Sequence, residues 1–269
     1  MTDDRFSRNE GLFGNDGQRR IGGTVVAIVG YGGLGSIVGM LLAYLGVVRF
    51  RIIEFDVVER SNLNRLVGAT PADVGAAKAS IAVRAIRAIQ PDAEVSVVLA
   101  AFAAEDAKAA IADADVIFGC VDHDQARVEI LAWAAGRSVP YIDAATDVIP
   151  KEDGTTIYGG RIVVTTGDGC PLCLDVLDQE ELAVARMTPD QRAAHARIYG
   201  IDVDALEVSG PSVVSINGVV ASIAVTEFMV LVTGLRTPTR SLTYRADRGG
   251  VVVDRTTPTP GCVYCAQYS

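Results

Sequence analysis

The chain of 269 residues has few of the features that mark secreted, nucleic-acid-binding or hydrolytic proteins. It has two histidines and one tryptophan, and 24 lysines and arginines stand against 33 acidic residues, which gives a net charge of −9. No basic block stands out, and this argues against a general nucleic-acid surface. The sequence contains no G-x-S-x-G, no Walker A motif, no Ser/His/Asp spacing, no internal repeat and no low-complexity tract. It therefore gives no reason to expect a serine hydrolase or a P-loop site.

Targeting and membrane signals are also weak. Residues 1–11 are charged and have no apolar core, so we expect no signal peptide and a cytoplasmic protein. The stretch from Ser212 to Gly234 is apolar enough to raise the question of a membrane span. It contains Asn217, Thr226 and Glu227, which favours a buried helix instead.

Apolar strand-like runs alternate with helical patterns along most of the chain. This order predicts an α/β fold, a Rossmann-like doubly wound and mostly parallel sheet with an antiparallel C-terminal extension. We treat 1–269 as one domain. Its expected parts are an N-terminal arm (1–23), a nucleotide-binding core (24–166), a crossover segment (167–211) and a C-terminal part (212–269). The last part would hold the buried helix, two antiparallel strands and a metal-binding tail.

The core begins with a strand-like run, 24–29, that ends in a G-x-G-x-x-G loop. A helical pattern covers 33–45, and a second strand, 49–55, ends in the acidic residues Glu54 and Asp56. The loop glycines are Gly30, Gly32, Gly33 and Gly35. This order is typical of a nucleotide-binding βαβ unit, because glycines let the backbone approach a phosphate and the helix supplies free N–H groups. The loop alone does not say which nucleotide binds.

Further polar residues follow other predicted strands. The sequence SNLNR at 61–65 comes after the second strand, at the sheet edge where ligands of such folds bind. Lys78 lies in the first half of a predicted helix, 72–89, and either contacts phosphate or is solvated. Asp122 follows the fourth predicted strand and suits a magnesium ion, whereas Asp124 better suits the N-cap of the next helix.

Four of the five cysteines form two C-x-x-C pairs. Cys170 and Cys173 make the first pair, and Cys262 and Cys265 make the second. Together they predict a structural zinc site of four thiolates with no open position, although two unrelated pairs of buried cysteines remain the alternative. The fifth, Cys120, lies in an apolar strand and is typical of a core residue.

The N-terminal arm carries several arginines among glycines. They are Arg5, Arg8, Arg19 and Arg20. The arm is either solvated or reaches a nucleotide, and the composition alone favours the solvated arm. His195, in the crossover segment, is expected at the surface of a helix.

In combination, these motifs resemble the ThiF/MoeB family, the bacterial relatives of ubiquitin-activating enzymes. The resemblance is carried by RFSR at 5–8, DGQRRI at 16–21, GYGGLGS at 30–36, EFDVVERSNLNR at 54–65, the two C-x-x-C pairs and the segment 210–228. Lys78 follows Arg65 by 13 positions and Asp122 follows Lys78 by 44, both as in the family. The chain departs from the family pattern at Glu54, where Asp is usual, at Leu66, where Gln is common, and at His123, where Asn is common.

The resemblance implies a reaction in which Mg-ATP adenylates the C-terminal carboxylate of a small ubiquitin-like or sulfur-carrier protein with a Gly-Gly tail, and pyrophosphate leaves. It implies that Gly33 and Gly35 approach the phosphates, that Glu54 holds the ribose with help from Asp56, that Asn62, Arg65 and Lys78 hold the triphosphate, and that Asp122 binds magnesium. Ser61, Asn64 and His123 belong to the same motifs and to the expected nucleotide site. Arg8 would reach the phosphates of a partner subunit, which implies a homodimer and makes Arg8, Arg65, Lys78 and Asp122 the expected catalytic set.

Other functions remain open at this point. An NAD(P)-dependent oxidoreductase shares the glycine loop, but it gives no role to Arg65, Lys78 and Asp122 as a set. ATP-dependent activation of a peptide or a tRNA base, and a non-enzymatic relative, are further alternatives. Residues 174–210 contain no cysteine, so we expect an acyl adenylate that passes to a downstream acceptor or conjugating protein without a thioester on this chain.

Overall fold

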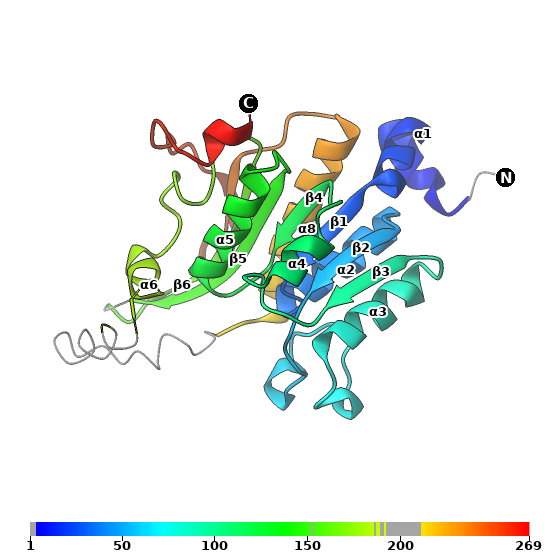
Figure 1. The fold of residues 1–269 in the computed structure, drawn as a ribbon, viewed down its shortest axis with the longest axis horizontal. Helices are drawn as coiled ribbons and strands as arrows, with labels where there is room; N and C mark the ends of the chain where they lie inside the picture. The colour runs from blue at the N-terminus through cyan, green and yellow to red at the C-terminus, as the bar shows by residue number, and fades with distance from the viewer. Residues whose placement is uncertain (1–3, 152, 186, 189–190, 192–210, 269) are drawn as a thin grey trace.

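A sheet of eight strands runs through the molecule (Figure 1). The computed structural model describes all residues except 1–3, 152, 186, 189–190, 192–210 and 269. The strands, in the spatial order β3-β2-β1-β4-β5-β6-β7-β8, are β1 Val25–Val29, β2 Arg49–Ile53, β3 Glu94–Val98, β4 Val116–Gly119, β5 Tyr141–Pro150, β6 Thr156–Thr165, β7 Ser241–Arg245 and β8 Gly250–Val253. Strands β1 to β5 pair in parallel, and β6, β7 and β8 add antiparallel pairs. The predicted fold class is confirmed.

Helices cover both faces of the sheet. On one face lie α2 Gly33–Leu45, α3 Lys78–Ile89 and α8 Val214–Thr233, and on the other α4 Glu105–Ala110 and α5 Asp124–Ala135. Figure 1 shows α5 in front of the sheet and α8 behind it. In β1 the side chains alternate, because Val26 and Ile28 pack with the α2 side while Ala27 and Val29 pack with the α5 side. A strand buried on both faces explains why the sequence there is a continuous apolar run.

The strand order reverses between β1 and β4. From β1 the chain winds outward through β2 to β3, and it then returns to β4 beside β1 and winds the other way to β5. Such a reversal leaves a crevice outside the carboxyl ends of the two central strands, which is where ligands bind in open α/β sheets. The topology therefore points to the segments that follow Val29 and Gly119.

The N-terminal segment is a packed helix, α1 Ser7–Gly23, with a kink at Gly14. Ile21 is fully buried, and Phe13 packs against the main core. Arg5 donates to the carbonyl of Ile89 at 2.6 Å. The segment is therefore a helix that docks on the core through Phe13 and Ile21, while Arg8, Arg19 and Arg20 remain exposed, as the solvated arm predicts.

The helix expected from residue 72 begins only at Lys78. Pro71–Asp73 forms a short 3₁₀ turn, and Gly75 then adopts a left-handed φ of +91°, which interrupts a helix. The Asp73 carboxylate accepts from the backbone N–H of Thr70 at 2.7 Å and pairs with Arg84 at 2.7 Å. The Arg84 guanidinium holds the pKa of the Asp73 carboxyl well below its usual range. This brace fixes the loop that precedes α3.

The apolar helix α8 is a core helix. By length and composition it could cross a membrane, but Val220, Ala224 and Phe228 are fully buried against the sheet and its neighbouring helices. Ser222 and Thr226 face outward and donate to carbonyls of their own helix. The expected buried helix is confirmed. The remaining described helix, α6 Gln179–Ala185, precedes the undescribed part of the crossover segment.

Two helical glycines should respond in opposite ways to a methyl group. A Cβ on Gly39 in α2 would lie 2.9 Å from the ring of Tyr31, which is fully buried and cannot move away. We expect Gly39→Ala to lower the free energy of unfolding by about 1–3 kcal/mol, as other overpacked cores do. Gly218 in α8 has no atom within 4 Å of that position. Gly218→Ala should raise the free energy of unfolding by about 0.5–1 kcal/mol, because alanine loses less backbone entropy.

Urea unfolding of both variants is the measurement. Equal effects of the two substitutions, or a stabilising Gly39→Ala change, would contradict the packing of Tyr31 against α2.

Candidate functional site

The glycine loop connects β1 to α2 at the crevice. Gly30 has a φ of +86°, and a Cβ there would lie 2.7 Å from the carbonyl oxygen of Cys120, beyond the end of β4. A Cβ on Gly35 would collide with the carbonyl of Gly30. Gly32, in contrast, faces open space. Glycine is thus required where the loop packs on β4 and on itself, and the first N–H groups of α2 are left accessible to an anion.

The Glu54 side chain binds the backbone of this loop. Its two carboxylate oxygens accept from the backbone N–H groups of Tyr31 at 2.7 Å and Asp56 at 2.8 Å. The side chain is buried, and this burial raises the pKa of the Glu54 carboxyl, while the two backbone donors oppose the shift. Glutamate, which is longer than the aspartate usual at this position, therefore links the end of β2 to the loop. Each oxygen keeps a second lone pair, and a ribose contact stays a prediction.

Two predicted cations lie beside the loop. Lys78 is the first residue of α3, and its ammonium pairs with Asp56 at 2.7 Å. Arg65 donates to the carbonyl of Ser61 at 2.9 Å and to Asn64 at 3.1 Å, and no carboxylate among the described residues pairs with it. Its side-chain carbons lie 2.9 and 3.0 Å from the position of a Cβ on Gly33. The aliphatic part of Arg65 therefore lies against the start of α2, while its guanidinium bonds to two neutral oxygens of the 61–64 segment.

The remaining polar residues of the SNLNR segment shape its backbone. Asn62 is buried, and its side-chain oxygen accepts from the backbone N–H of Glu59 at 3.0 Å. Ser61 donates to the Glu59 carboxylate at 3.1 Å. These bonds form a capped 3₁₀ turn that presents Arg65 toward the loop.

Asp122 and His123 follow β4 and are exposed, with 64% and 50% of their side chains accessible. Asp122 has room for a cation. The expected N-cap role of Asp124 is wrong, because His123 occupies the cap position and makes no capping bond. The Glu181 carboxylate from α6 instead accepts the N–H of Asp124 at 2.6 Å, and Asp124 accepts from the N–H of Asp178 at 2.6 Å.

A buried ion pair behind Asp122 was missed by the sequence analysis. Arg127 in α5 pairs with Asp143 in β5 at 2.5 Å, and both side chains are almost completely buried. Arg127 also donates to the carbonyl of Val121, immediately before Asp122. Tyr141 adds a bond to Asp143 at 2.9 Å. The network fixes the loop that carries Asp122, and the only signal in the sequence was charge within otherwise apolar elements.

Cys120 lies under the glycine loop, near Gly30 and Gly35. Burial raises the pKa of its thiol to about 12. At neutral pH it is therefore a protonated, weakly nucleophilic side chain.

The four cysteines of the C-x-x-C pairs meet in space. Cys170 lies 3.7 Å from Cys262 and Cys173 lies 3.7 Å from Cys265, sulfur to sulfur, and all four sulfurs lie within 4.8 Å of one another. Metal–sulfur bonds of about 2.3 Å in a tetrahedron require sulfur separations of about 3.8 Å, so the cluster fits a four-thiolate metal site. The two alternative pairs of unrelated cysteines are thereby excluded.

This cluster lies away from the glycine loop. The adjoining tail contacts the start of β5, where Ser138 donates to the carbonyl of Gln267 at 2.8 Å and Tyr268 donates to that of Val139 at 2.9 Å. The glycine loop follows the carboxyl end of β1, which runs parallel to β5 within the sheet. The two sites therefore occupy opposite edges of the sheet.

Arg8 is not brought to the glycine loop of its own chain. Its neighbour Asn9 donates to the carbonyl of Leu45, the last residue of α2, at 3.5 Å. Gly33 begins this helix of 13 residues, and so lies about 18 Å away along its axis. Arg8 is exposed at the far edge, whereas the structure gathers the loop, Glu54, Asp56, Lys78, Arg65 and Asp122 at the near one.

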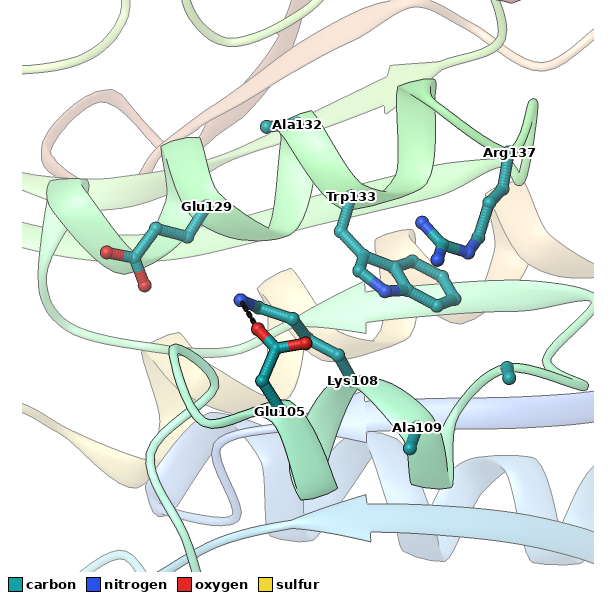
Figure 2. A pocket seen from close by; sticks show the side chains of 8 residues that line it. Glu105, Lys108, Ala109, Glu129, Ala132, Trp133 and Arg137 are labelled. Atoms are coloured by element: carbon teal, nitrogen blue, oxygen red, sulfur yellow. Dashed lines mark hydrogen bonds and ion pairs between the residues drawn. The ribbon is translucent and has the colours of Figure 1, made fainter.

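A separate groove lies between α4 and α5 (Figure 2). Lys108 bonds Glu105 at 2.8 Å, the Arg137 guanidinium lies 4.2 Å from the centre of the Trp133 ring, and Glu129 accepts from the amide of Gln125 at 3.1 Å. The groove is formed by the later turns of α5, so it does not join the crevice at the start of that helix. Of the other expectations, the surface position of His195 falls outside the described residues.

Comparison with known proteins identifies the family of this chain. The family model described as "ThiF family" matches residues 6–256. The chain belongs to the ThiF family. It is 27% identical over 230 residues to the sulfur carrier protein ThiS adenylyltransferase of Escherichia coli (strain K12), covering 84% of this chain and 79% of that protein. It is 32% identical over 165 residues to the molybdopterin-synthase adenylyltransferase of the same organism, covering 61% of this chain and 64% of that protein.

Solved structures support the fold. The crystal structure of Escherichia coli MccB with AMPCPP and MccA superposes with a TM-score of 0.76 at 19% identity, and covers 98% of this ThiF-family chain and 74% of the MccB chain. At this identity the likeness concerns the fold alone. The sequence-based assignment to the ThiF/MoeB family is confirmed by the family match and by these adenylyltransferase relatives.

Proposed function

We propose that this ThiF-family protein uses Mg-ATP to adenylate the C-terminal carboxylate of a small ubiquitin-like or sulfur-carrier protein, releasing pyrophosphate. The observation that carries the proposal is Arg65, a cation without a carboxylate partner among the described residues, whose side-chain carbons lie against Gly33 at the start of α2. The relatives named adenylyltransferases supply the reaction class.

The chemistry explains why cations are needed here. A carboxylate must attack an α-phosphate that is itself anionic, so the charges must be screened and the groups aligned. Arg65, Lys78 and the N–H groups at Gly33 and Gly35 would hold phosphate oxygens, with Asn62 shaping the loop. Glu54 and Asp56 would take the ribose. Asp122 would hold magnesium, which neutralises charge on the phosphates.

The alternatives differ in how much of this arrangement they use. An NAD(P)-dependent oxidoreductase would need the glycine loop and Glu54 but not the placement of Arg65 and Lys78 beside it. Activation of a peptide or a tRNA base would keep the whole ATP site and differ only in the acyl or base substrate. The site geometry thus favours ATP activation, and the choice of carrier protein rests on the named relatives.

The four-cysteine cluster would hold a structural zinc ion. Four thiolates fill the preferred coordination of zinc and leave no open position for chemistry. The position at the opposite edge of the sheet from Gly33 agrees with a structural role. The ion would join the tail to the segment after β6.

A homodimer would complete the nucleotide site. Arg8 is exposed and lies at the far end of α2 from its own glycine loop. It can therefore contribute to phosphate binding only in a partner subunit. A protein acceptor would then take the acyl group from the adenylate, since residues 174–210 contain no cysteine and Cys120 is a half-buried thiol with a raised pKa.

The first prediction concerns nucleotide chemistry. Lys78→Ala and Arg65→Ala should each lower ATP–pyrophosphate exchange roughly 100-fold or more, since each removes a cation from a preorganised phosphate site. Lys108→Ala is the matched control and should change exchange less than twofold, because Lys108 pairs with Glu105 in the separate groove, away from the proposed nucleotide site. Near-normal exchange in both site variants would refute the site, and NAD reduction in its place would favour the oxidoreductase.

The second prediction concerns the metal. Elemental analysis should find about one zinc per chain. Cys265→Ser should lose the metal and lower Tm by about 5 °C or more, because metal binding is coupled to folding. Cys120→Ala should keep the metal. An unchanged Tm after complete removal of zinc would contradict the structural role.

A third prediction tests the shared site. Light scattering should give a dimer, and equal mixing of Arg8→Ala and Lys78→Ala subunits should restore about a quarter of wild-type exchange, because half the dimers carry one intact site. Mixing Arg65→Ala with Lys78→Ala should restore nothing, since those two residues serve the same site from one subunit. A monomer, or equal behaviour of the two mixtures, would rule out the arrangement in trans.

The fourth prediction concerns covalent intermediates. With a carrier protein that supports exchange, a non-reducing gel should show no thiol-sensitive adduct on this chain, because Cys120 is protonated at neutral pH. An adduct that forms in the wild type and is lost in Cys120→Ala, with exchange intact, would overturn this expectation.

A further inference from the structure

Asn217 is a buried polar residue in the first turn of α8, which is otherwise an apolar helix. Only 1% of its surface is exposed, and its buried neighbours along the next two turns are Val220, Ala221 and Ala224. Its side-chain oxygen accepts from the hydroxyl of Thr146 in β5 at 3.1 Å. Its amide nitrogen donates to the hydroxyl of Ser212 at 3.1 Å. These bonds join α8 to β5 and to the segment before α8.

The amide nitrogen has a hydrogen left over. An Asn side chain carries two N–H donors, and only the Ser212 hydroxyl accepts from it within the part of the chain that the structure describes. Leaving a buried donor unpaired costs about 1–3 kcal/mol. A residue that only joined α8 to β5 would gain nothing from this spare donor.

The position of the nitrogen suggests its partner. Nδ2 lies 2.6 Å from the place that a Cβ on Gly33 would take, and the next nearest atoms to that place belong to Arg65. The spare donor and the side-chain carbons of Arg65 therefore meet at Gly33, the first residue of α2, and the Arg65 guanidinium extends from there to the 61–64 segment. A helix N-terminus and a guanidinium both favour an anion, and phosphate oxygens accept several such bonds at once.

We propose that Asn217 is a further nucleotide-binding residue, and that its Nδ2 donates a hydrogen bond to a phosphate oxygen of bound ATP at Gly33. The inference rests on the proposed ATP-dependent function and extends its site to α8. It also explains why Gly33 must lack a side chain, since a Cβ there would displace both Asn217 and Arg65.

Calorimetry with Mg-ATP, and with adenosine as a probe without phosphate, tests the assignment. Asn217→Asp keeps the shape and the acceptor for Thr146, but it places a carboxylate against the phosphates. Asn217→Leu removes the donor without adding charge. We expect both variants to bind Mg-ATP at least about tenfold more weakly, the Asp variant more so, and to bind adenosine with unchanged affinity. Thr226→Val, on the exposed face of the same helix, should leave both affinities unchanged.

A role limited to joining α8 and β5 makes a different prediction. It predicts a lower melting temperature of the ligand-free variants, together with affinities for ATP and adenosine that are either weakened equally or both unchanged. Either pattern of affinities overturns the proposal. If the wild type binds Mg-ATP and supports exchange, and Asn217→Asp binds Mg-ATP with the same affinity, only this inference fails. If the wild type binds no Mg-ATP, the proposed function fails with it.

Discussion

The convergence of parallel strand ends is the constraint on which the site depends. Because β1 and β4 lie side by side and their connections leave in opposite directions, the segments after Val29 and Gly119 must meet over an uncovered crevice. The glycine loop fills this crevice with backbone N–H groups, and Glu54 links it to the segment after β2 by accepting from Tyr31 in the loop and from Asp56. Side chains from loops and helices that are distant in sequence are then added around a rigid centre.

The two ends of the parallel strands carry different sites. The edge where β1, β2 and β4 end carries the glycine loop, Lys78 and Asp122. The edge where β5 begins carries the C-terminal tail beside the four-cysteine cluster, through the bonds of Ser138 and Tyr268. A closed thiolate site needs no access to substrate, so it can stabilise the tail without competing for the crevice.

Local chemistry accounts for what could be predicted from the sequence. The bounds of the helix Gly33–Leu45 and the loop before it follow from glycine spacing and apolar periodicity, which are properties of adjacent residues. The start of α3 and the cap at Asp124 were predicted wrongly for a different reason. Arg84 and Glu181 act on those segments from 11 and 57 positions away, and such partners are visible only in the folded chain. The pair of Arg127 with Asp143 escaped notice for the same reason, as did the contact of Asn217 with Gly33.

The distribution of cations explains how an acidic chain can present a site for an anion. Arg84, Arg127 and Arg236 each pair with a carboxylate of a structural brace, so their charges are already neutralised. Among the described residues Arg65 bonds only to neutral oxygens. Lys78, whose side chain is 12% exposed, pairs with Asp56, whose side chain is 48% exposed. The carboxylate side of this pair is therefore open to water. A triphosphate, with several anionic oxygens in one place, would compete with this single carboxylate for Lys78, while the freed carboxylate of Asp56 would remain hydrated. The site needs few cations because those few are held by neutral or solvent-exposed partners, at the one place where the backbone also favours an anion.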